Sequence, residues 1–142
     1  MTDIKRRMSN VHEEALARHL CGRRTRGSGN QWRDQMDGSH DRLTETVAFR
    51  WDGKATFNKS ISVTTEMWEK AVEQCSLERP MLGLRIYRDE TLAVVVDLVA
   101  IGLEDMGELV ERSRRLDDIE AAIAALYTDE TSDEINAWIE AH

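Results

Sequence analysis

The chain has 142 residues and a formal net charge of −8, and 41% of its residues are hydrophobic while 32% are charged. This length suits one domain with a hydrophobic core, and the composition is ordinary for a soluble protein. No apolar run approaches the roughly 20 residues of a membrane span, and the first ten residues lack the apolar stretch of a signal peptide. We therefore expect a cytoplasmic protein with no membrane partner.

Charge is distributed unevenly along the chain. Residues 1–88 carry 16 Lys and Arg against 12 Asp and Glu, whereas residues 89–142 carry 3 against 15. The first part is able to attract phosphate. The acidic part is expected to face away from DNA or towards a protein partner. The two cysteines, Cys21 and Cys75, lack CxxC spacing, so we expect them to be buried free thiols.

The first expected element is a helix from Ser9 to Cys21, ended by Gly22. Ser9 is a good N-cap, and the acidic residues after it suit the first turn. Helical spacing places Glu13 on the core-facing side, whereas Glu14 lies about 100° round the helix, nearer solvent. The predicted core-facing side comprises Glu13, Leu16, Ala17 and Leu20.

A glycine-rich basic loop, GRRTRGSGN (22–30), follows this helix. Such a loop suits contact with a phosphate backbone, and a flexible solvated turn is an equally good interpretation. Residues 31–43 are polar and turn-like, and they contain Asp34, Asp37 and Asp41.

Residues 44–57 alternate between apolar and polar side chains, which predicts a strand. Asp52 and Gly53 form a dipeptide that also suits a hairpin turn, after which residues 54–57 would resume a strand. Residues 59–63 are expected to be another extended piece. Trp51 in this region, and Trp68 further on, are expected to belong to the core.

A second helix is predicted over residues 66–75, capped by Thr64 or Thr65, with Met67, Ala71 and Cys75 facing inward. The apolar runs 81–87 and 91–101 predict a hairpin of buried strands. The order of helices and strands indicates an α/β fold with a central mixed β-sheet flanked by helices. We divide the chain into a core, residues 1–103, and an acidic helical C-terminal extension, residues 104–142, packed on the core. Within that extension, residues 104–115, 116–127 and 129–142 read as helical.

The segment WDGKAT (51–56) carries the pattern most suggestive of chemistry. In an extended segment, Asp52 and Lys54 face the same side. A carboxylate there can hold a hard divalent cation such as Mg²⁺, while the ammonium orients a metal-bound water or stabilises charge on a phosphate. A D-x-K pattern alone also occurs by chance on surface turns.

The order of these features resembles the archaeal-type Holliday-junction resolvases and their phage relatives in the PD-(D/E)XK nuclease superfamily. The resemblance covers roughly residues 11–100. HEEALARHLCGRRTRGSGN (12–30) looks like their first helix and glycine-serine loop, and WDGKAT stands where they have (D/E)-x-K. The segments KSISVTTEMWEKAVEQC and ERPMLGLRIY look like the strand, helix and penultimate strand that follow.

The resemblance implies a restriction-endonuclease-like fold and a set of site residues. The first-helix glutamate falls on Glu13, and the second carboxylate and lysine fall on Asp52 and Lys54. No proline marks the central aspartate, for which we prefer Asp37, with Asp34 and Asp41 as alternatives. Glu13, Asp37 and Asp52 would then bind Mg²⁺ or Mn²⁺, and these three with Lys54 would be catalytic.

The same resemblance implies a homodimer that resolves Holliday junctions by paired nicks, in the host cytoplasm if the chain is phage-encoded. Branched DNA would be recognised by shape through its backbone. The expected DNA-binding residues are Arg23, Arg24, Arg26, Ser28, Arg33, Lys59 and Ser60.

Three alternatives to this hypothesis remain open. A related nuclease acting on other branched or duplex DNA would use the same site. A non-catalytic DNA-binding domain would keep the fold without cleavage. An unrelated α/β protein with a chance D-x-K pattern would not bring Glu13, Asp37 and Asp52 together.

Overall fold

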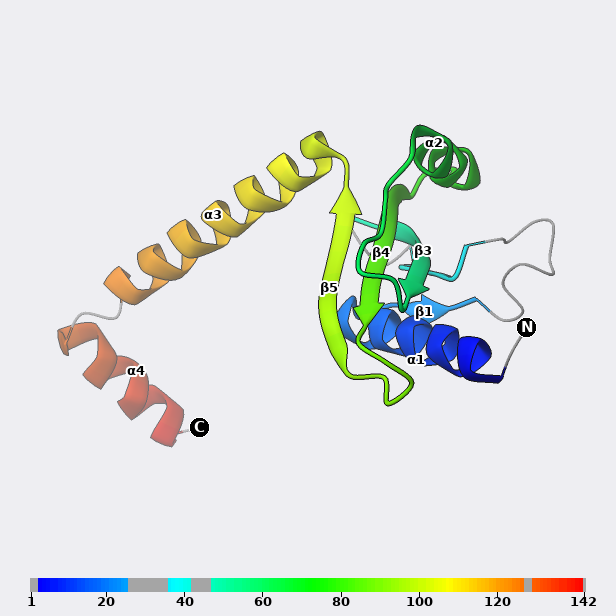
Figure 1. Cartoon of the computed structure of the whole chain (residues 1–142). Helices are drawn as coiled ribbons and strands as arrows, with labels where there is room; N and C mark the ends of the chain where they lie inside the picture. The colour runs from blue at the N-terminus through cyan, green and yellow to red at the C-terminus, as the bar shows by residue number, and fades with distance from the viewer. Residues whose placement is uncertain (1–2, 26–35, 42–46, 127–128, 142) are drawn as a thin grey trace. The chain divides into compact units, whose positions relative to one another are not determined.

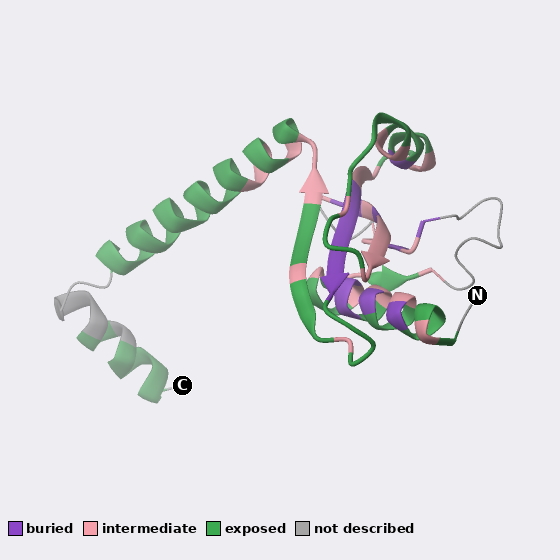
Figure 2. Ribbon diagram, in the orientation of Figure 1, coloured by how far each residue is buried: buried purple, intermediate pink, exposed green. Residues whose placement is uncertain are grey.

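In the computed structural model of the protein, the most deeply buried strand is β4 (Arg79–Tyr87), whose residues from Met81 onward are all buried. Figure 2 shows this strand as the buried centre of the sheet. Its apolar run leaves no solvent-facing side, which is typical of a strand covered on both faces. The predicted strand over residues 81–87 is therefore confirmed.

The structure describes residues 3–25, 36–41, 47–126 and 129–141. The chain divides into two compact units, Met1–Gly102 and Leu103–His142. The first unit contains the sheet and two helices, and the second contains two further helices.

Five strands form one mixed sheet in the order β1-β2-β3-β4-β5 (Figure 1). β4 pairs in parallel with β3 (Phe49–Thr56) and antiparallel with β5 (Val94–Ile101). β1 (Arg23–Arg24) and β2 (Gly38–Ser39) extend the sheet on the far side of β3 through antiparallel pairs. The predicted mixed sheet flanked by helices, in an α/β fold, is confirmed.

β3 runs without a break through Asp52 and Gly53, so the hairpin turn considered for this dipeptide is wrong. Asp52 lies opposite Leu82, and Gly53 lies opposite Gly83, in the parallel pairing with β4. A long parallel ladder keeps the segment extended and overrides the local turn preference. The extended piece expected over residues 59–63 forms no strand.

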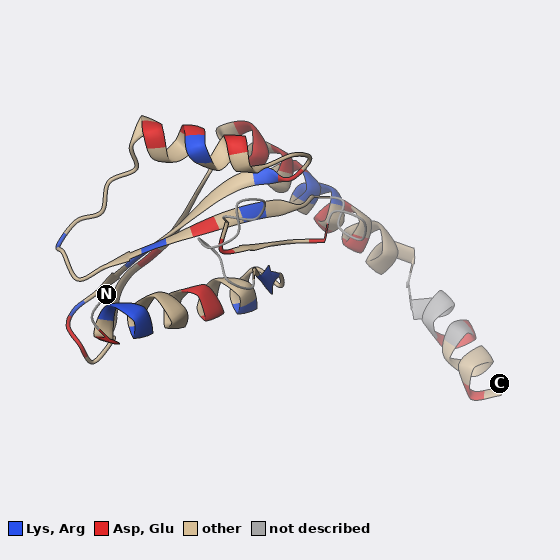
Figure 3. Cartoon of the chain, turned by 90° about the vertical axis from the view of Figure 1, so that its right-hand side faces the viewer, with Lys and Arg blue, Asp and Glu red and all other residues tan. Residues whose placement is uncertain are grey.

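Two helices cover opposite faces of the sheet. A side chain added at Gly83 would meet Leu16 of α1 (Asp3–His19). The neighbouring Leu82 packs instead in a cluster with Ala71 of α2 (Thr65–Gln74). Because successive residues of a strand point to opposite faces, α1 and α2 lie on different sides, as Figure 3 shows with the sheet seen between them.

α1 is longer than predicted. It begins at Asp3 rather than at Ser9, which lies inside the helix and is no N-cap. Its buried residues are Met8, His12, Ala15 and Leu16, so the core-facing stripe is centred about one residue earlier than expected. The sequence did not predict the buried histidine, because histidine is buried less often than aliphatic residues are.

The chain leaves α1 through a left-handed residue. Cys21 takes this role with φ of 54°, and the N–H of Gly22 donates to the carbonyl of Ala17. The helix therefore ends before Cys21, whereas the sequence had suggested an end at Gly22. Cys21 is exposed, which corrects the expectation of a buried thiol.

α2 agrees closely with the sequence. Thr64 is its N-cap, and the Thr64 hydroxyl accepts a hydrogen bond from the N–H of Met67 at 3.2 Å. Ala71 is buried and Met67 packs against the same cluster, as predicted. Cys75 is half-buried, and burial together with the nearby Glu78 carboxylate raises the pKa of its thiol to about 11.

β5 forms the expected hairpin with β4, but it is not a buried strand. Val94, Val95, Leu98 and Val99 are 46–58% exposed, and β5 ends the sheet on that side. Across the pair, the guanidinium of Arg85 binds both carboxylate oxygens of its partner Asp97, at 3.0 and 2.6 Å.

The second unit consists of α3 (Leu103–Leu126) and α4 (Asp129–Ala141). The helical segments expected over 104–115 and 116–127 thus join in one helix. Two Arg–Glu pairs one turn apart, Arg112 with Glu108 and Arg115 with Glu111, stabilise it locally. Within the described residues, no helix combines the length and apolar character needed to cross a membrane.

Replacement of Gly83 by alanine tests the close contact between α1 and the sheet. The new Cβ would lie 2.6 Å from both terminal methyl carbons of Leu16. We expect Gly83→Ala to lower the free energy of unfolding by about 1–3 kcal/mol, the usual cost of overpacking. Gly107→Ala is the control, because nothing lies within 4 Å of that added Cβ and alanine favours the helix. Urea unfolding measures both, and wild-type stability for Gly83→Ala would contradict this packing.

Candidate functional site

The candidate site lies where β3 loses its partner strand. β2 pairs only with Arg50 and Trp51 of β3, so the later residues of β3 have no strand on that side among the described residues. On its other side, β3 remains paired with β4 as far as Thr56. At Asp52, Gly53 and Lys54, β3 is therefore paired with β4 on one side and has an open edge on the other.

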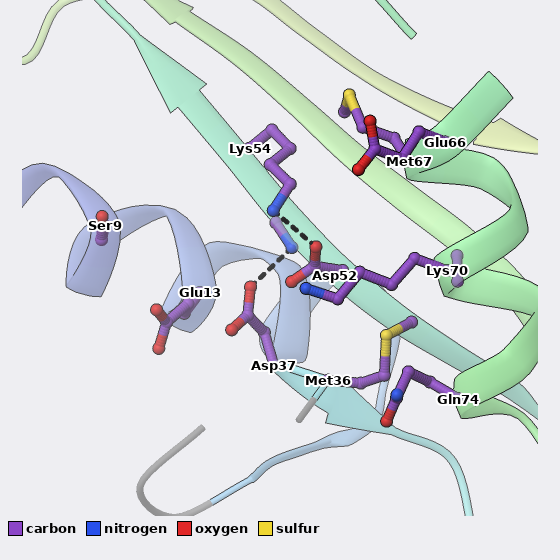
Figure 4. A pocket seen from close by; sticks show the side chains of 12 residues that line it. Ser9, Glu13, Met36, Asp37, Asp52, Lys54, Glu66, Met67, Lys70 and Gln74 are labelled. Atoms are coloured by element: carbon purple, nitrogen blue, oxygen red, sulfur yellow. Dashed lines mark hydrogen bonds and ion pairs between the residues drawn. The ribbon is translucent and has the colours of Figure 1, made fainter. Parts of the chain in front are cut away.

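A cavity of about 580 Å³ opens at this edge. Its walls come from α1, the segment before β2, strand β3 and α2, as Figure 4 shows. The structure thus brings the four predicted catalytic residues together from three separate stretches of chain. The charged side chains of the lining are Glu13, Asp37, Asp52, Lys54, Glu66 and Lys70.

Asp37 takes the place of the missing strand partner. Its Oδ2 accepts a hydrogen bond of 2.6 Å from the backbone N–H of Gly53. This contact joins the residue preceding β2 to the open edge of β3 and holds the Asp37 carboxylate beside Asp52. Of the two alternatives for the central aspartate, Asp41 does not line the pocket and lies 3.8 Å from Arg23. Asp34 lies outside the described residues.

Asp52 and Lys54 point to the same side of β3, as their spacing predicts. The Nζ of Lys54 lies 2.7 Å from Oδ2 of Asp52, and this ion pair faces the pocket (Figure 4). The intervening Gly53 faces α1, where an added Cβ would lie 3.1 Å from both His12 and Asp37. Because successive residues of a strand point to opposite faces, the Asp52–Lys54 pair lies on the face of β3 opposite to the one that packs against α1.

Glu13 reaches the pocket from α1 but is bound by an arginine. Nη2 of Arg24, on β1, lies 2.6 Å from Oε2 of Glu13, and Nη1 lies 3.3 Å from Oε1 of Glu14. The Glu13 side chain is 16% exposed and that of Glu14 is 67% exposed, in the order that helical geometry predicts. The structure therefore links a candidate metal ligand directly to a candidate DNA-binding residue.

His12 fixes the position of α1 behind the pocket. It is 2% exposed, and its Nε2 donates to the carbonyl of Gly83 at 3.0 Å. Burial holds the pKa of His12 below its ordinary value, although the hydrogen bond to Gly83 raises it. A neutral imidazole thus ties the helix to the sheet one residue before Glu13.

The donor chemistry of the pocket suits a hard cation, although the oxygens are not gathered at one point. Carboxylates are the ligands that Mg²⁺ and Mn²⁺ prefer. Among the residues that the structure describes, no group of three or more His, Cys, Asp or Glu is placed to hold a metal ion. Instead, Glu13, Asp37 and Asp52 each bind a cationic or N–H donor of the chain itself. A divalent ion would have to compete with these contacts.

The expected DNA-binding residues are only partly described. Arg23 is exposed on β1 beside Arg24, and Lys59 and Ser60 are exposed between β3 and α2. None of these four lines the pocket. Arg26, Ser28 and Arg33 lie outside the described residues.

Sequence reasoning missed the wall contributed by α2. Glu66, Lys70 and Gln74 line the pocket from successive turns of this helix. Each of these polar residues comes one position before an inward-facing residue, which is Met67, Ala71 or Cys75. The polar residues therefore lie together on the helix surface, beside its apolar side. This i, i+4, i+8 spacing of polar residues was the signal that could have found them.

Comparisons with known proteins identify no family for this chain. No family model matches it, and no curated protein or solved structure is significantly similar to it. The assignment of function therefore depends on the residues of the pocket.

Proposed function

We propose that this protein is a metal-dependent, structure-selective DNA endonuclease that resolves Holliday junctions by paired nicks. The observation that carries this proposal is that Glu13, Asp37, Asp52 and Lys54 all line one open pocket. This shared lining counts against a chance D-x-K pattern, because the carboxylates come from segments far apart in the sequence. A mixed sheet with helices on both faces and the site at an open strand edge is compatible with a restriction-endonuclease-like fold.

Glu13, Asp37 and Asp52 would hold one or two Mg²⁺ or Mn²⁺ ions. When bound, such an ion supplies an activated water and neutralises charge on the phosphate. A water oxygen would attack phosphorus and give up a proton to the solvent, while the bond from phosphorus to the 3′ oxygen breaks and that oxygen takes up a proton from the solvent. Lys54, released from Asp52, stabilises negative charge on the phosphate as the new bond forms. The backbone N–H of Gly53 keeps Asp37 oriented toward the pocket.

We also propose that the active form is a homodimer, because two paired nicks require two sites. β5 supports this proposal as an edge strand with exposed apolar residues on it. Its one charged residue, Asp97, is already paired with Arg85 of the same chain, which removes a source of repulsion between two copies.

We expect Leu98→Lys to convert a dimer into a monomer in analytical ultracentrifugation. A dimer that survives this change would exclude β5 as the interface.

One observation favours a second candidate, a non-catalytic DNA-binding domain. Three of the four carboxylates of the pocket are engaged by Arg24, Lys54 and a backbone N–H, and the described residues contain no preassembled metal site. Such a domain would bind branched DNA and show no carboxylate-dependent cleavage in Mg²⁺ or Mn²⁺. A related nuclease acting on other DNA would cleave a Y-fork or linear duplex as fast as a four-way junction.

Asp52→Asn tests catalysis. We expect cleavage of a synthetic four-way junction in Mg²⁺ to fall by at least about a hundredfold, because the amide is a poor ligand for a hard cation. The fold should persist, with an unchanged thermal midpoint. Competition among four-way junction, Y-fork and linear duplex measures substrate preference in the same assay. Wild-type rates for Asp52→Asn would count decisively against the proposed site.

Asp37→Asn and Asp41→Asn form a matched pair within the same experiment. Asp37 lines the pocket and Asp41 does not, so only the first change should reduce cleavage strongly. A larger loss for Asp41→Asn would assign the central position to Asp41 instead.

Arg24→Met tests whether the arginine competes with the metal. Removal of the guanidinium should raise the affinity for Mn²⁺ about two- to fivefold in the absence of DNA, since a partly exposed ion pair contributes up to about 1 kcal/mol. Arg23→Met is the control, because the Arg23 side chain is 75% exposed and lies near Asp41, which does not line the pocket. Isothermal titration calorimetry measures both. A lower Mn²⁺ affinity for Arg24→Met would mean that Arg24 positions Glu13 for the metal.

A further inference from the structure

Lys70 differs from Lys54 and Arg24 in its contacts with the described residues. Lys54 is held by Asp52, and Arg24 is held by Glu13 and Glu14. Among the described residues, no hydrogen bond or ion pair engages the Lys70 ammonium. In Figure 4 its side chain extends from α2 across the pocket toward Asp52.

The direction of Lys70 is informative because α2 offers it other partners. Glu66 lies four residues before it and Glu73 three residues after it, spacings at which ion pairs form on a helix surface. Lys70 forms an ion pair with neither, and it contributes to the pocket lining instead. Lys70 is an exposed residue that lines the cavity opposite the carboxylates of Asp37 and Asp52.

The charged side chains that line the pocket indicate what the Lys70 ammonium could bind. Four carboxylates and two ammonium groups line the pocket, which leaves a formal charge of −2. A single divalent ion would only cancel that charge and would provide no surplus positive charge for an incoming phosphodiester. Lys54 starts from a contact with Asp52, so an unpaired cation on the opposite wall is the group most readily available to an anion.

We propose that Lys70 is a substrate-binding residue that contacts a phosphate of the DNA backbone from the α2 wall of the pocket. The inference rests on the proposed nuclease function and deepens it, since it assigns one phosphate contact to a helix that sequence reasoning left out. The strand to be cut would lie between β3 and α2, with Lys54 and Lys70 on its two sides. Lys70 contributes to binding, whereas Asp52 contributes to the chemical step.

The test compares Lys70→Gln, Lys70→Arg and Glu66→Gln with the wild type on a labelled four-way junction. Binding is measured by fluorescence anisotropy in Ca²⁺ at several salt concentrations, and single-turnover cleavage is measured in Mg²⁺. We expect Lys70→Gln to weaken binding about tenfold, as loss of a charged hydrogen bond does. The slope of log Kd against log salt should decrease by about one.

The remaining variants separate a phosphate contact from a structural role. Lys70→Arg keeps the charge and should bind within about threefold of the wild type. Glu66→Gln removes a negative charge one turn away and should tighten binding or leave it unchanged. At saturating DNA, Lys70→Gln should cleave within about threefold of the wild-type rate, the reverse of the pattern expected for a metal ligand.

Two outcomes would overturn the inference, and they are distinguishable. If the wild type binds and cleaves while Lys70→Gln matches it in affinity and salt slope, Lys70 is no phosphate ligand and the nuclease proposal stands. If the wild type neither binds nor cleaves the junction, the proposed function fails, and the assignment of Lys70 fails with it.

Discussion

The close packing of α1 against two neighbouring glycines positions the rest of the site. Gly53 and Gly83 lie side by side in the β3–β4 pairing. A Cβ added at Gly83 would collide with Leu16 of α1, and one added at Gly53 would lie only 3.1 Å from His12. This gap lets His12 reach the carbonyl of Gly83 from within the core. Because Glu13 follows His12, the same contact places its carboxylate at the rim of the pocket. A helix held one side chain further from the sheet would withdraw Glu13 from Asp37 and Asp52.

Opposing charges compensate the acidic side chains of the pocket. Arg24 compensates Glu13, Lys54 compensates Asp52, and the N–H of Gly53 satisfies Asp37. Clustered carboxylates would otherwise repel one another at short range. A metal ion that binds Asp52 would have to displace Lys54, which would then be available to a phosphate. A phosphate that binds Arg24 would likewise leave Glu13 available to the metal. This coupling follows from shared residues and needs no large movement of the sheet.

Much of this arrangement is predictable from sequence, and the rest depends on tertiary context. The spacing of Asp52 and Lys54 predicts their common side, and helical geometry predicts that Glu13 is less exposed than Glu14. By contrast, the parallel ladder with β4 decides that β3 continues through Gly53, which local turn preference alone cannot reveal. The contribution of α2 depends on how a helix docks beside an open strand edge, so Lys70 becomes visible only in the structure.

The proposed function requires that acidic groups from separate segments share one divalent ion in this pocket. A crystal structure of the protein grown with Mn²⁺, with anomalous scattering to locate the metal, tests it most directly. We expect a manganese peak coordinated by Asp37 and Asp52, with Glu13 bound directly or through water and Lys54 turned away from Asp52. Manganese bound elsewhere, with these carboxylates still held by Arg24 and Lys54 at saturating metal, would contradict it.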